Sequence, residues 1–494
     1  MVPNSSSCPH HLSPGRRSPR WIRPAAPPPT GPAATRRGPV ILCLVACALV
    51  ASLTLFLSAV PHYDPFGWLV WGLELTHSDV GFSTLTGPSW KPLPVILAVP
   101  LSVLGPAAPA AWLILARTGG ALAFVFAYRL GRLLGSTAAG VLAVIALALI
   151  PGWLRELALG GELSLLVVLV LAAIDRHSAG RPGQAMGLAF AAALLRSEVW
   201  PFLGLYCIWA WRAGSVDRRL IAACCVLVPA LWFIPDWLTL GDPLHGSAVA
   251  RASTEARTPA MIEHPALEVM NRAYRLVPLP LHMLAAAAVG LALLRRDRRI
   301  VVLAGAVLGW TALVAVMAAV GGYPGLSRFL VPAAAVVCIL GSVGAFGIVR
   351  LAGPRGRWPV AGLLLVTLAV SVGPRWEAAV EEIDSAQGWA RVARELETAV
   401  QMAGGRQSVA CRRPVISHTA QTQLAWILGL PFGAVRTDVD GPGLVFVLTD
   451  PTVGRPPSVS VQLPRRPVAW TDDWEVYEVA PPTAPHHACP RRFR

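Results

Sequence analysis

The chain has 494 residues, of which 54% are hydrophobic and only 14% are charged, and this composition excludes an ordinary water-soluble enzyme. We therefore predict a polytopic membrane protein. The formal net charge of +15 could suggest nucleic acid, but the arginines stand in short clusters between apolar runs. Clusters of this kind are typical of the cytoplasmic loops of membrane proteins, so we expect no nucleic-acid partner.

Residues 1–38 include the run "PGRRSPRWIRPAAPPPTGPAATRRG", which has no apolar pattern that could pack. This run predicts a disordered cytoplasmic tail. The next stretch, from Pro39 to Val60, is about long enough to span a bilayer, and no small-residue cleavage pattern accompanies it. We expect a first membrane span here rather than a cleaved signal peptide.

A transmembrane domain is expected over residues 39–374, where apolar segments alternate with arginine clusters. The apolar segments are 40–60, 91–104, 109–128, 137–150, 161–174, 183–196, 199–212, 219–235, 277–294, 300–320, 328–349 and 358–374. Several are shorter than the ~20 residues that cross a bilayer, so they must be tilted, kinked or re-entrant. All arginine clusters can be cytoplasmic only if 91–104 does not fully cross, which predicts an all-α bundle of about eleven spans plus one re-entrant segment.

Residues 375–494 then face outward and are predicted to form a small extracytoplasmic α/β domain. The spacing of Trp389, Leu396 and Val400 predicts an amphipathic helix over 384–400. Strand-like runs at 408–411, 443–448 and 474–479 flank a second helix-like stretch, 418–429. Cys411 and Cys489 are the two cysteines of this polar region, and the sequence leaves open whether they form a disulfide.

The first outward loop begins "PHYDPFGWLVWGLELTHSDVG" and places Asp64 near the membrane surface. A carboxylate there is costly unless it is hydrated, paired or functional. The alternative is a helix-end cap or a solvated loop residue. Glu74 and Asp79 add acidity to the same loop, and either residue taken alone is more typical of a solvated side chain than of a catalytic one.

The stretch "GPSWKPLP" contains Lys91, the only lysine of the chain. The expected topology places it on the outer side, against the positive-inside trend, where the prolines fix the start of the re-entrant segment. An ammonium there can bind a lipid phosphate, or it can simply anchor the segment at the headgroups.

Three further charged positions lie at the outer ends of predicted spans. Glu162 opens a span after two glycines, which fits a functional carboxylate or a helix N-terminal residue equally well. Arg196 and Glu198, in "LLRSEVWPF", can contact a substrate or pair with each other. Arg328, in "GGYPGLSRFLVP", is a second outer cation whose guanidinium suits phosphate oxygens, with membrane anchoring as the alternative.

In their order and sidedness these residues resemble the GT-C superfamily of membrane glycosyltransferases, in the branch with protein O-mannosyltransferases and the aminoarabinose transferases of lipid A. The resemblance covers most of residues 40–350. It is carried by "HYDPFGW" after the first span, "KPLP" at the next segment, an acidic residue near the start of a later span, and "SRFLVP".

The resemblance implies a multi-pass plasma-membrane enzyme with a cytoplasmic N-terminus. Such an enzyme moves a sugar from a polyprenyl-phosphate donor to the hydroxyl of a glycan, lipid or protein. Asp64 would be the general base, and Lys91 and Arg328 would bind the donor phosphate. Glu162, where this branch usually has Asp, is the second catalytic candidate. Because no Asp-Glu pair directly follows the first span, the sequence leaves open whether a divalent cation is a cofactor.

We also regard several side chains of the outer loops as candidate substrate contacts: Tyr63, Glu74, His77, Asp79, Trp90, Arg196, Glu198, Asp242 and His245. Three rival functions remain. A transporter or flippase for lipid-linked sugars usually shows repeated halves, which we do not find. A glycosidase could use Asp64 and Glu162, but the cations would then have no obvious function. A noncatalytic scaffold that displays the C-terminal domain is the third.

Overall fold

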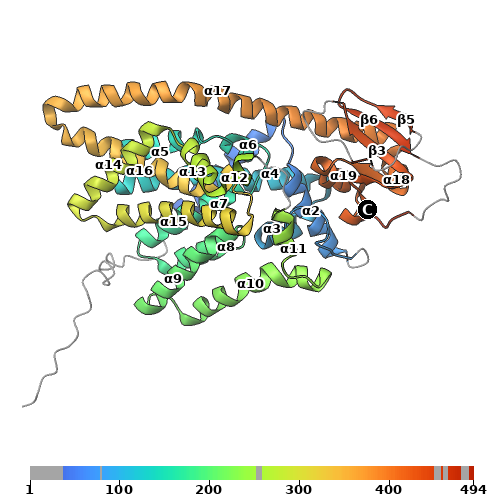
Figure 1. The fold of residues 1–494 in the computed structure, drawn as a ribbon, viewed down its shortest axis with the longest axis horizontal. Coiled ribbons are helices and arrows are strands. Elements are labelled where there is room, and N and C mark those ends of the chain that lie inside the picture. The colour runs from blue at the N-terminus through green and yellow to red at the C-terminus, as the bar shows by residue number, and fades with distance from the viewer. Residues whose placement is uncertain are drawn as a thin grey trace, which may run out of the picture.

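The structure is a computed structural model that describes residues 37–77, 81–251, 259–449, 458–459, 465–479 and 489–493. Residues 1–36 of the expected tail and the candidate Asp79 lie outside the described residues. Figure 1 shows a helical bundle with a small mixed domain at one end. An all-α membrane part with a C-terminal α/β domain is thereby confirmed as the architecture.

The bundle consists of seventeen described helices, the last of which continues into the C-terminal domain. They are α1 (Arg37–Leu53), α2 (Tyr63–Thr76), α3 (Pro92–Ser102), α4 (Ala108–Leu134), α5 (Thr137–Ala148), α6 (Trp153–Ala158), α7 (Leu163–Ser178), α8 (Pro182–Ala193), α9 (Trp200–Ala213), α10 (Arg218–Leu240), α11 (His245–Arg251), α12 (Pro259–Glu263), α13 (Pro265–Leu276), α14 (Leu279–Arg295), α15 (Arg298–Gly321), α16 (Val331–Leu351) and α17 (Gly353–Met402).

Helix α16 forms the centre of the bundle. It is apolar on all sides, and every residue from Val331 to Ala345 is buried, as expected for a helix surrounded by other helices. Its closest neighbour is α14. A Cβ atom at Gly344 would lie 1.8 Å from the carbonyl oxygen of Leu284, so glycine is required for this close approach.

By length and hydropathy, six helices of the described part of the chain can cross a membrane, or seven if α13 and α14, which are bent by 94°, form one span. The expectation of about eleven spans also counted shorter apolar segments. One of these is α5, with 12 residues, while α3, with 11 residues, corresponds to the segment expected to be re-entrant and not counted as a span. A helix of 11 residues is about 16 Å long, too short to cross the ~30 Å hydrocarbon core. The span count therefore stays a prediction.

Besides the end of α17, the described part of the C-terminal domain contains two short α-helices and two sheets. Its helices are α18 (Gly405–Cys411) and α19 (Gln421–Leu428), and its strands are β1 (Pro414–Ile416), β2 (Asp438–Val439), β3 (Gly443–Leu448), β4 (Ser458–Val459), β5 (Arg465–Trp470) and β6 (Trp474–Val479). The larger sheet has the order β1-β3-β6-β5, with β1 parallel to β3 and the other pairs antiparallel. Strands β2 and β4 pair in parallel.

Two of the three expected strands are confirmed, since 443–448 and 474–479 are β3 and β6. The strand expected over 408–411 was wrong, because these residues complete α18. The helix begins after Gly404, at φ 107°, and the chain becomes extended only at Pro414, beyond Arg413 at φ 49°.

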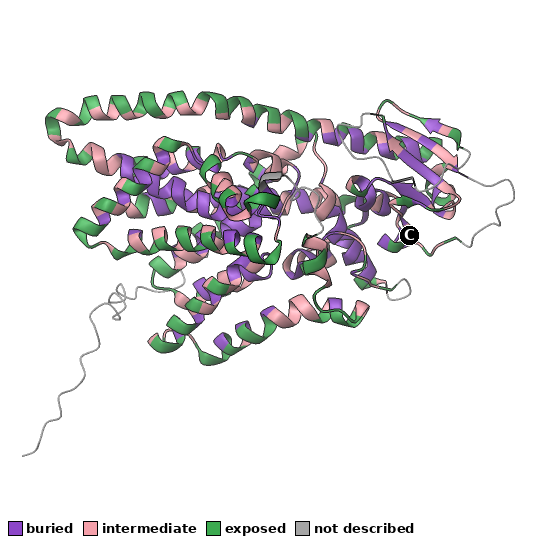
Figure 2. Cartoon of the chain, in the orientation of Figure 1, coloured by how far each residue is buried: buried purple, intermediate pink, exposed green. Residues whose placement is uncertain are grey.

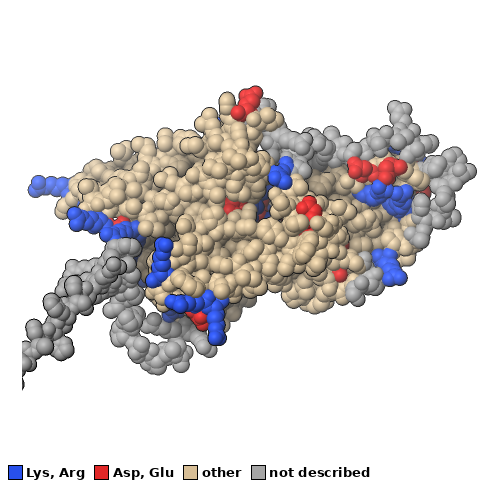
Figure 3. Space-filling model, turned by 60° about the horizontal axis from the view of Figure 1, so that its bottom comes forward, with Lys and Arg blue, Asp and Glu red and all other residues tan. Residues whose placement is uncertain are grey.

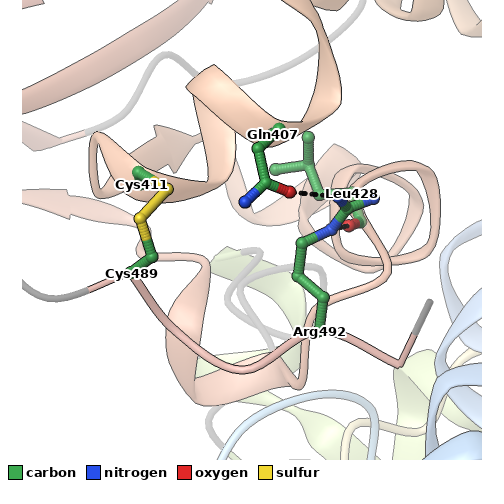
Figure 4. Close-up of a disulfide and its surroundings, with 5 residues drawn as sticks. All are labelled: Gln407, Cys411, Leu428, Cys489 and Arg492. Atoms are coloured by element: carbon green, nitrogen blue, oxygen red, sulfur yellow. Dashed lines mark hydrogen bonds between the residues drawn. A yellow bond between two sulfur atoms is a disulfide. The ribbon is translucent and has the colours of Figure 1, made fainter.

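A disulfide joins Cys411 to Cys489, which answers the question that the sequence left open. Figure 4 shows that the chain beyond Cys489 returns to α19. There Arg492 donates a hydrogen bond to the carbonyl of Leu428 at 2.8 Å and another to Gln407 at 2.6 Å. The described residues near the C-terminus are thus tied to the domain covalently and by hydrogen bonds.

Helix α17 has 50 residues and connects the far end of the bundle to the C-terminal domain (Figure 1). Along the bundle it is largely exposed, and inside the C-terminal domain one face becomes buried (Figure 2). The buried face includes Trp389, Leu396 and Val400, and the indole nitrogen of Trp474 in β6 donates to the carbonyl of Val392 at 2.9 Å. The amphipathic helix predicted over 384–400 is confirmed as part of α17. The boundary expected at residue 374 falls inside this continuous helix.

Candidate active site

Asp64 lies in the first turn of α2, where a carboxylate interacts favourably with the helix dipole. Its side chain is 38% exposed, and one oxygen is 3.3 Å from the Nζ atom of Lys91. Helix α2 packs against α19 of the C-terminal domain, and Thr422 in α19 donates a hydrogen bond to the carbonyl of Tyr63, so Asp64 lies next to that domain. Asp64 is thus a residue of the first helical turn with an ion pair, whereas the cap position of α2 is His62, which makes no side-chain cap hydrogen bond.

Lys91 directly precedes α3 and has the extended backbone, φ −142° and ψ 117°, that a following proline favours. Its side chain is only 8% exposed. The ammonium is paired with Asp64 and with Glu162, and it lies 5.4 Å from the centre of the Trp68 ring. Lys91 is thus a buried lysine with two carboxylate partners, and its binding of a lipid phosphate stays a prediction.

Glu162 immediately precedes α7 and extends the charge network to Arg196. Arg196 Nη1 donates to Glu162 at 2.9 Å, and Arg196 Nη2 donates to Glu198 at 2.7 Å. The guanidinium also lies 3.9 Å from the centre of the Phe329 ring. Arg196 and Glu198 thus pair with each other, one of the two possibilities that the sequence allowed, and both belong to the same buried network.

Arg328 lies in the 3-10 helix η6 (Ser327–Leu330), directly before α16. Burial alone would raise the pKa of Asp64, but the positive charges of Lys91 and Arg328, together with His62, hold that pKa below its usual value. The structure therefore brings Asp64, Lys91, Glu162 and Arg328 into one electrostatic neighbourhood. These four residues come from four separate segments of the chain.

Two residues of the site were missed by the sequence reasoning. Tyr323 donates to Glu198 at 3.0 Å and accepts from Arg196 at 3.0 Å. Glu156, in α6, has a raised pKa, chiefly because it is buried, with Glu162 and Asp64 adding to the effect and Arg328 opposing it. Its carboxylate occupies the space where a Cβ of Gly161 would be. Tyr323 lies in the same "GGYPG" run that drew attention to Arg328, so proximity in sequence was an available signal.

Four other candidate substrate contacts make hydrogen bonds or packing contacts outside this charge network: Trp90, His77, Asp242 and His245. Trp90 donates to the carbonyl of Leu231 at 2.9 Å and packs against Trp71. His77 hydrogen-bonds to the carbonyl of Leu73 at 2.9 Å. Asp242 accepts from the backbone nitrogen of Leu244 at 2.9 Å, which stabilises the turn before α11, and His245 begins that helix. Substrate contact by these residues stays a prediction.

Glu74 is a residue of α2 and is 3% exposed, and its carboxylate contacts the C-terminal domain. It accepts hydrogen bonds from the backbone nitrogens of Phe432, at 3.1 Å, and Ser83, at 3.5 Å. Burial raises its pKa from 4.5 to about 7, against the effect of these two donors. Glu74 therefore belongs to the contact between the bundle and the C-terminal domain.

The raised pKa of Glu74 predicts a pH-dependent stability. Between pH 4.5 and about 7 the folded protein holds a proton that the unfolded chain has lost, so the free energy of unfolding falls as the pH rises through this window. The full effect is about 3 kcal/mol. We expect Glu74→Gln, which is neutral at every pH, to remove most of this slope. Thermal unfolding of the purified protein at about pH 5 and pH 8 measures it, and an equal slope in both proteins would contradict the prediction.

Within the described ranges, no group of three or more His, Cys, Asp or Glu side chains is arranged to hold a metal ion. Whether a divalent cation takes part stays open.

Two of the solved structures that are similar to this chain match nearly its whole length. ArnT from Cupriavidus metallidurans in the apo state aligns with a TM-score of 0.52 and 16% identity, over 91% of this chain and 100% of ArnT. The same protein bound to undecaprenyl phosphate gives 0.51 and 14%, with the same coverage. This chain has the GT-C fold. The fold expected from the sequence resemblance is thereby confirmed.

A further similar structure is the oligosaccharyltransferase of Archaeoglobus fulgidus in the apo form, at a TM-score of 0.42 and 14% identity over 70% of this chain. The chain spans about half of that protein's length, 56%. No protein-family model and no curated protein matches the sequence. At these identities the GT-C fold is what the chain shares with its structural neighbours, and its activity has to be argued from its own residues.

Proposed function

We propose that this protein is a membrane glycosyltransferase that moves a sugar from a polyprenyl-phosphate donor to an acceptor hydroxyl outside the cytoplasm. The observation that carries the proposal is the convergence of Asp64, Lys91, Glu162 and Arg328 at one end of a GT-C fold. A carboxylate beside two cations supplies the two functions that such a transfer requires, proton removal and stabilisation of a phosphate leaving group.

The distribution of arginines supports the proposed sidedness. Of the described helices with 14 or more residues, five carry arginine in their last turn, namely α4, α7, α9, α14 and α16, with Arg132, Arg176, Arg212, Arg295 and Arg350. The shorter helices α6, α11 and α13 carry Arg155, Arg251 and Arg275 in their last turns. Figure 3 shows Lys and Arg side chains gathered toward the end of the bundle away from the C-terminal domain. By the positive-inside rule this end is cytoplasmic, so the site and the C-terminal domain lie outside. The Cys411–Cys489 disulfide fits an oxidising outer compartment.

The proposed reaction forms a bond between the acceptor oxygen and the anomeric carbon of the sugar. The bond from that carbon to the phosphate oxygen breaks, and the phosphate keeps the electron pair. Lys91 and Arg328 would stabilise this growing negative charge, and preorganised donors of this kind can lower a barrier by roughly 3–4 kcal/mol each. Asp64 would accept the proton of the attacking hydroxyl.

Glu162 has a different function in this proposal from the one that the resemblance implied. It lies between Lys91 and Arg196, and its side chain is 10% exposed. Both of its oxygens are already engaged, since Oε1 accepts a hydrogen bond from Arg196 and Oε2 accepts one from Lys91, so neither is available to an incoming hydroxyl. We assign Glu162 the positioning of the Lys91 ammonium rather than proton transfer.

ArnT supports the donor class, since its structure was solved with undecaprenyl phosphate bound. The direct test incubates the purified protein with radiolabelled undecaprenyl-phosphate sugars and a panel of membrane lipids, glycans and hydroxyl-bearing peptides. Release of undecaprenyl phosphate with labelled product supports a transferase. Movement of an intact donor across vesicle membranes, without release, would indicate the transporter instead.

Lys91 variants test the phosphate-binding assignment. Lys91→Ala is expected to raise the KM for the donor by about tenfold or more, because a charge-assisted contact of roughly 1.5–3 kcal/mol is lost. Lys91→Arg keeps the charge and should be milder. Initial rates at varied donor concentration measure both. An unchanged donor dependence in both variants would leave only the anchoring function.

A further inference from the structure

The N-terminus of α2, which carries Asp64, is covered by the C-terminal domain. Thr422 in α19 donates a hydrogen bond to the carbonyl oxygen of Tyr63 at 2.8 Å. The ring of Trp389 in α17 lies 5.3 Å from that of His62. Two successive residues before Asp64 are therefore held by elements more than 300 positions away in the chain. The domain forms a wall of the site rather than a module displayed beside it.

His418 is a titratable side chain of this wall that contacts Tyr63, the residue directly before Asp64. It begins the 3-10 helix η7 (His418–Ala420), directly after β1 and Ser417, and it is exposed. Its ring centre lies 4.6 Å from that of Tyr63, and its Nδ1 atom is 3.5 Å from the Tyr63 hydroxyl. The register of β1 beside β3 fixes the start of η7, so the sheet determines where this imidazole lies.

The charges on the two sides of Asp64 differ. Lys91 and Arg328 are cations on the side of the membrane bundle, where the donor phosphate is proposed to bind. His418 lies on the side of the C-terminal domain. Although His418 is exposed as a residue, the protein atoms around its ring lower its pKa below 6.5 by desolvation, an effect that Asp64 opposes. The imidazole is therefore mostly neutral at pH 7, and one ring nitrogen can accept a proton.

We propose that His418 is a catalytic residue contributed by the C-terminal domain, which contacts the acceptor and receives its hydroxyl proton by way of Asp64. This inference rests on the proposed function. When the acceptor oxygen bonds to the anomeric carbon and the phosphate leaves with the electron pair, the proton passes to Asp64. Asp64 is held in its ionised form by two cations and therefore does not keep the proton. The lone pair of the imidazole takes it and releases it to water.

The test compares His418→Ala with a matched control. Tyr274 in α13 and His282 in α14 form another tyrosine–histidine ring contact, with ring centres 5.5 Å apart. His282→Ala thus removes a similar ring from a similar pair. Undecaprenyl phosphate release is measured for wild type and both variants with the donor and acceptor that give the fastest wild-type turnover, with and without added imidazole.

We expect His418→Ala to lower kcat/KM for the acceptor by about tenfold to a hundredfold while KM for the donor stays within about twofold. Added imidazole should restore part of the rate in His418→Ala and leave His282→Ala unchanged. A wild-type rate in His418→Ala, or a slow variant that imidazole does not rescue, would overturn the catalytic assignment and leave the proposed function intact. The absence of release by the wild type from any donor would overturn both.

Discussion

Asp64→Asn is expected to lower the rate of sugar transfer by about a hundredfold to ten-thousandfold, the usual contribution of a positioned general base. Asparagine keeps the shape of the side chain and can still accept a hydrogen bond from Lys91, but it cannot take the hydroxyl proton. Turnover is measured as release of labelled product at saturating donor. Size-exclusion chromatography and thermal unfolding in detergent show whether the variant is folded.

The matched control is Glu377→Gln, which neutralises an exposed carboxylate in α17 and should leave the rate unchanged. Turnover of Asp64→Asn within about threefold of wild type would remove Asp64 from proton transfer. A loss of activity that accompanies loss of folding would instead assign Asp64 to the stability of the Lys91 ion pair.

Arg196→Met is expected to destabilise the protein by about 3–5 kcal/mol, because it leaves buried carboxylates without their cation. Glu198 is fully buried, and Glu162 would keep only Lys91 as a partner. The double variant Arg196→Met, Glu198→Gln should recover part of the loss, since it also removes a buried negative charge. Chemical unfolding of the purified protein gives the free energy of unfolding for each variant.

A surface ion pair supplies the comparison for this experiment. Arg391 pairs with Asp473 at 3.2 Å, but its side chain is 66% exposed, so Arg391→Met should cost no more than about 1 kcal/mol. Equal losses in Arg196→Met and Arg391→Met would show that the buried network does not stabilise the fold.

Composition and arginine placement were sufficient to predict the membrane bundle and the small α/β domain, because both depend on patterns that extend over many residues. Lys91 could also be singled out, because a cation in an outer loop conflicts with the topology that the other basic residues define. The sequence could not show that Lys91, Glu162 and Arg196 form one chain of ion pairs. Those contacts join loops that are adjacent only after the helices pack.

The same limit explains why the sequence did not reveal the surroundings of Glu74, Glu156 and His418. Burial raises the pKa of Glu74, against the effect of the hydrogen bond from the nitrogen of Phe432, and that contact joins residues 358 positions apart in the sequence. His418 is an isolated histidine in a region without a catalytic pattern, and only the contact with Tyr63 gives it a place in the site.

The prediction of the number of spans was limited for another reason. Helices as short as α3 are compatible with re-entrant and interfacial positions alike, and hydropathy does not separate the two.

Helix α17 restricts the position of the C-terminal domain relative to the bundle. With 50 residues it is about 75 Å long, and the same rod serves as the last helix of the bundle and as the scaffold on which the sheet packs. One residue added between Pro374 and Trp389 would raise the domain by about 1.5 Å and rotate it by about 100°, which would turn His418 away from Tyr63. The number of residues in α17 thus fixes both the distance and the orientation of the C-terminal domain relative to the candidate site. We expect substitutions in this segment to be tolerated more readily than insertions or deletions.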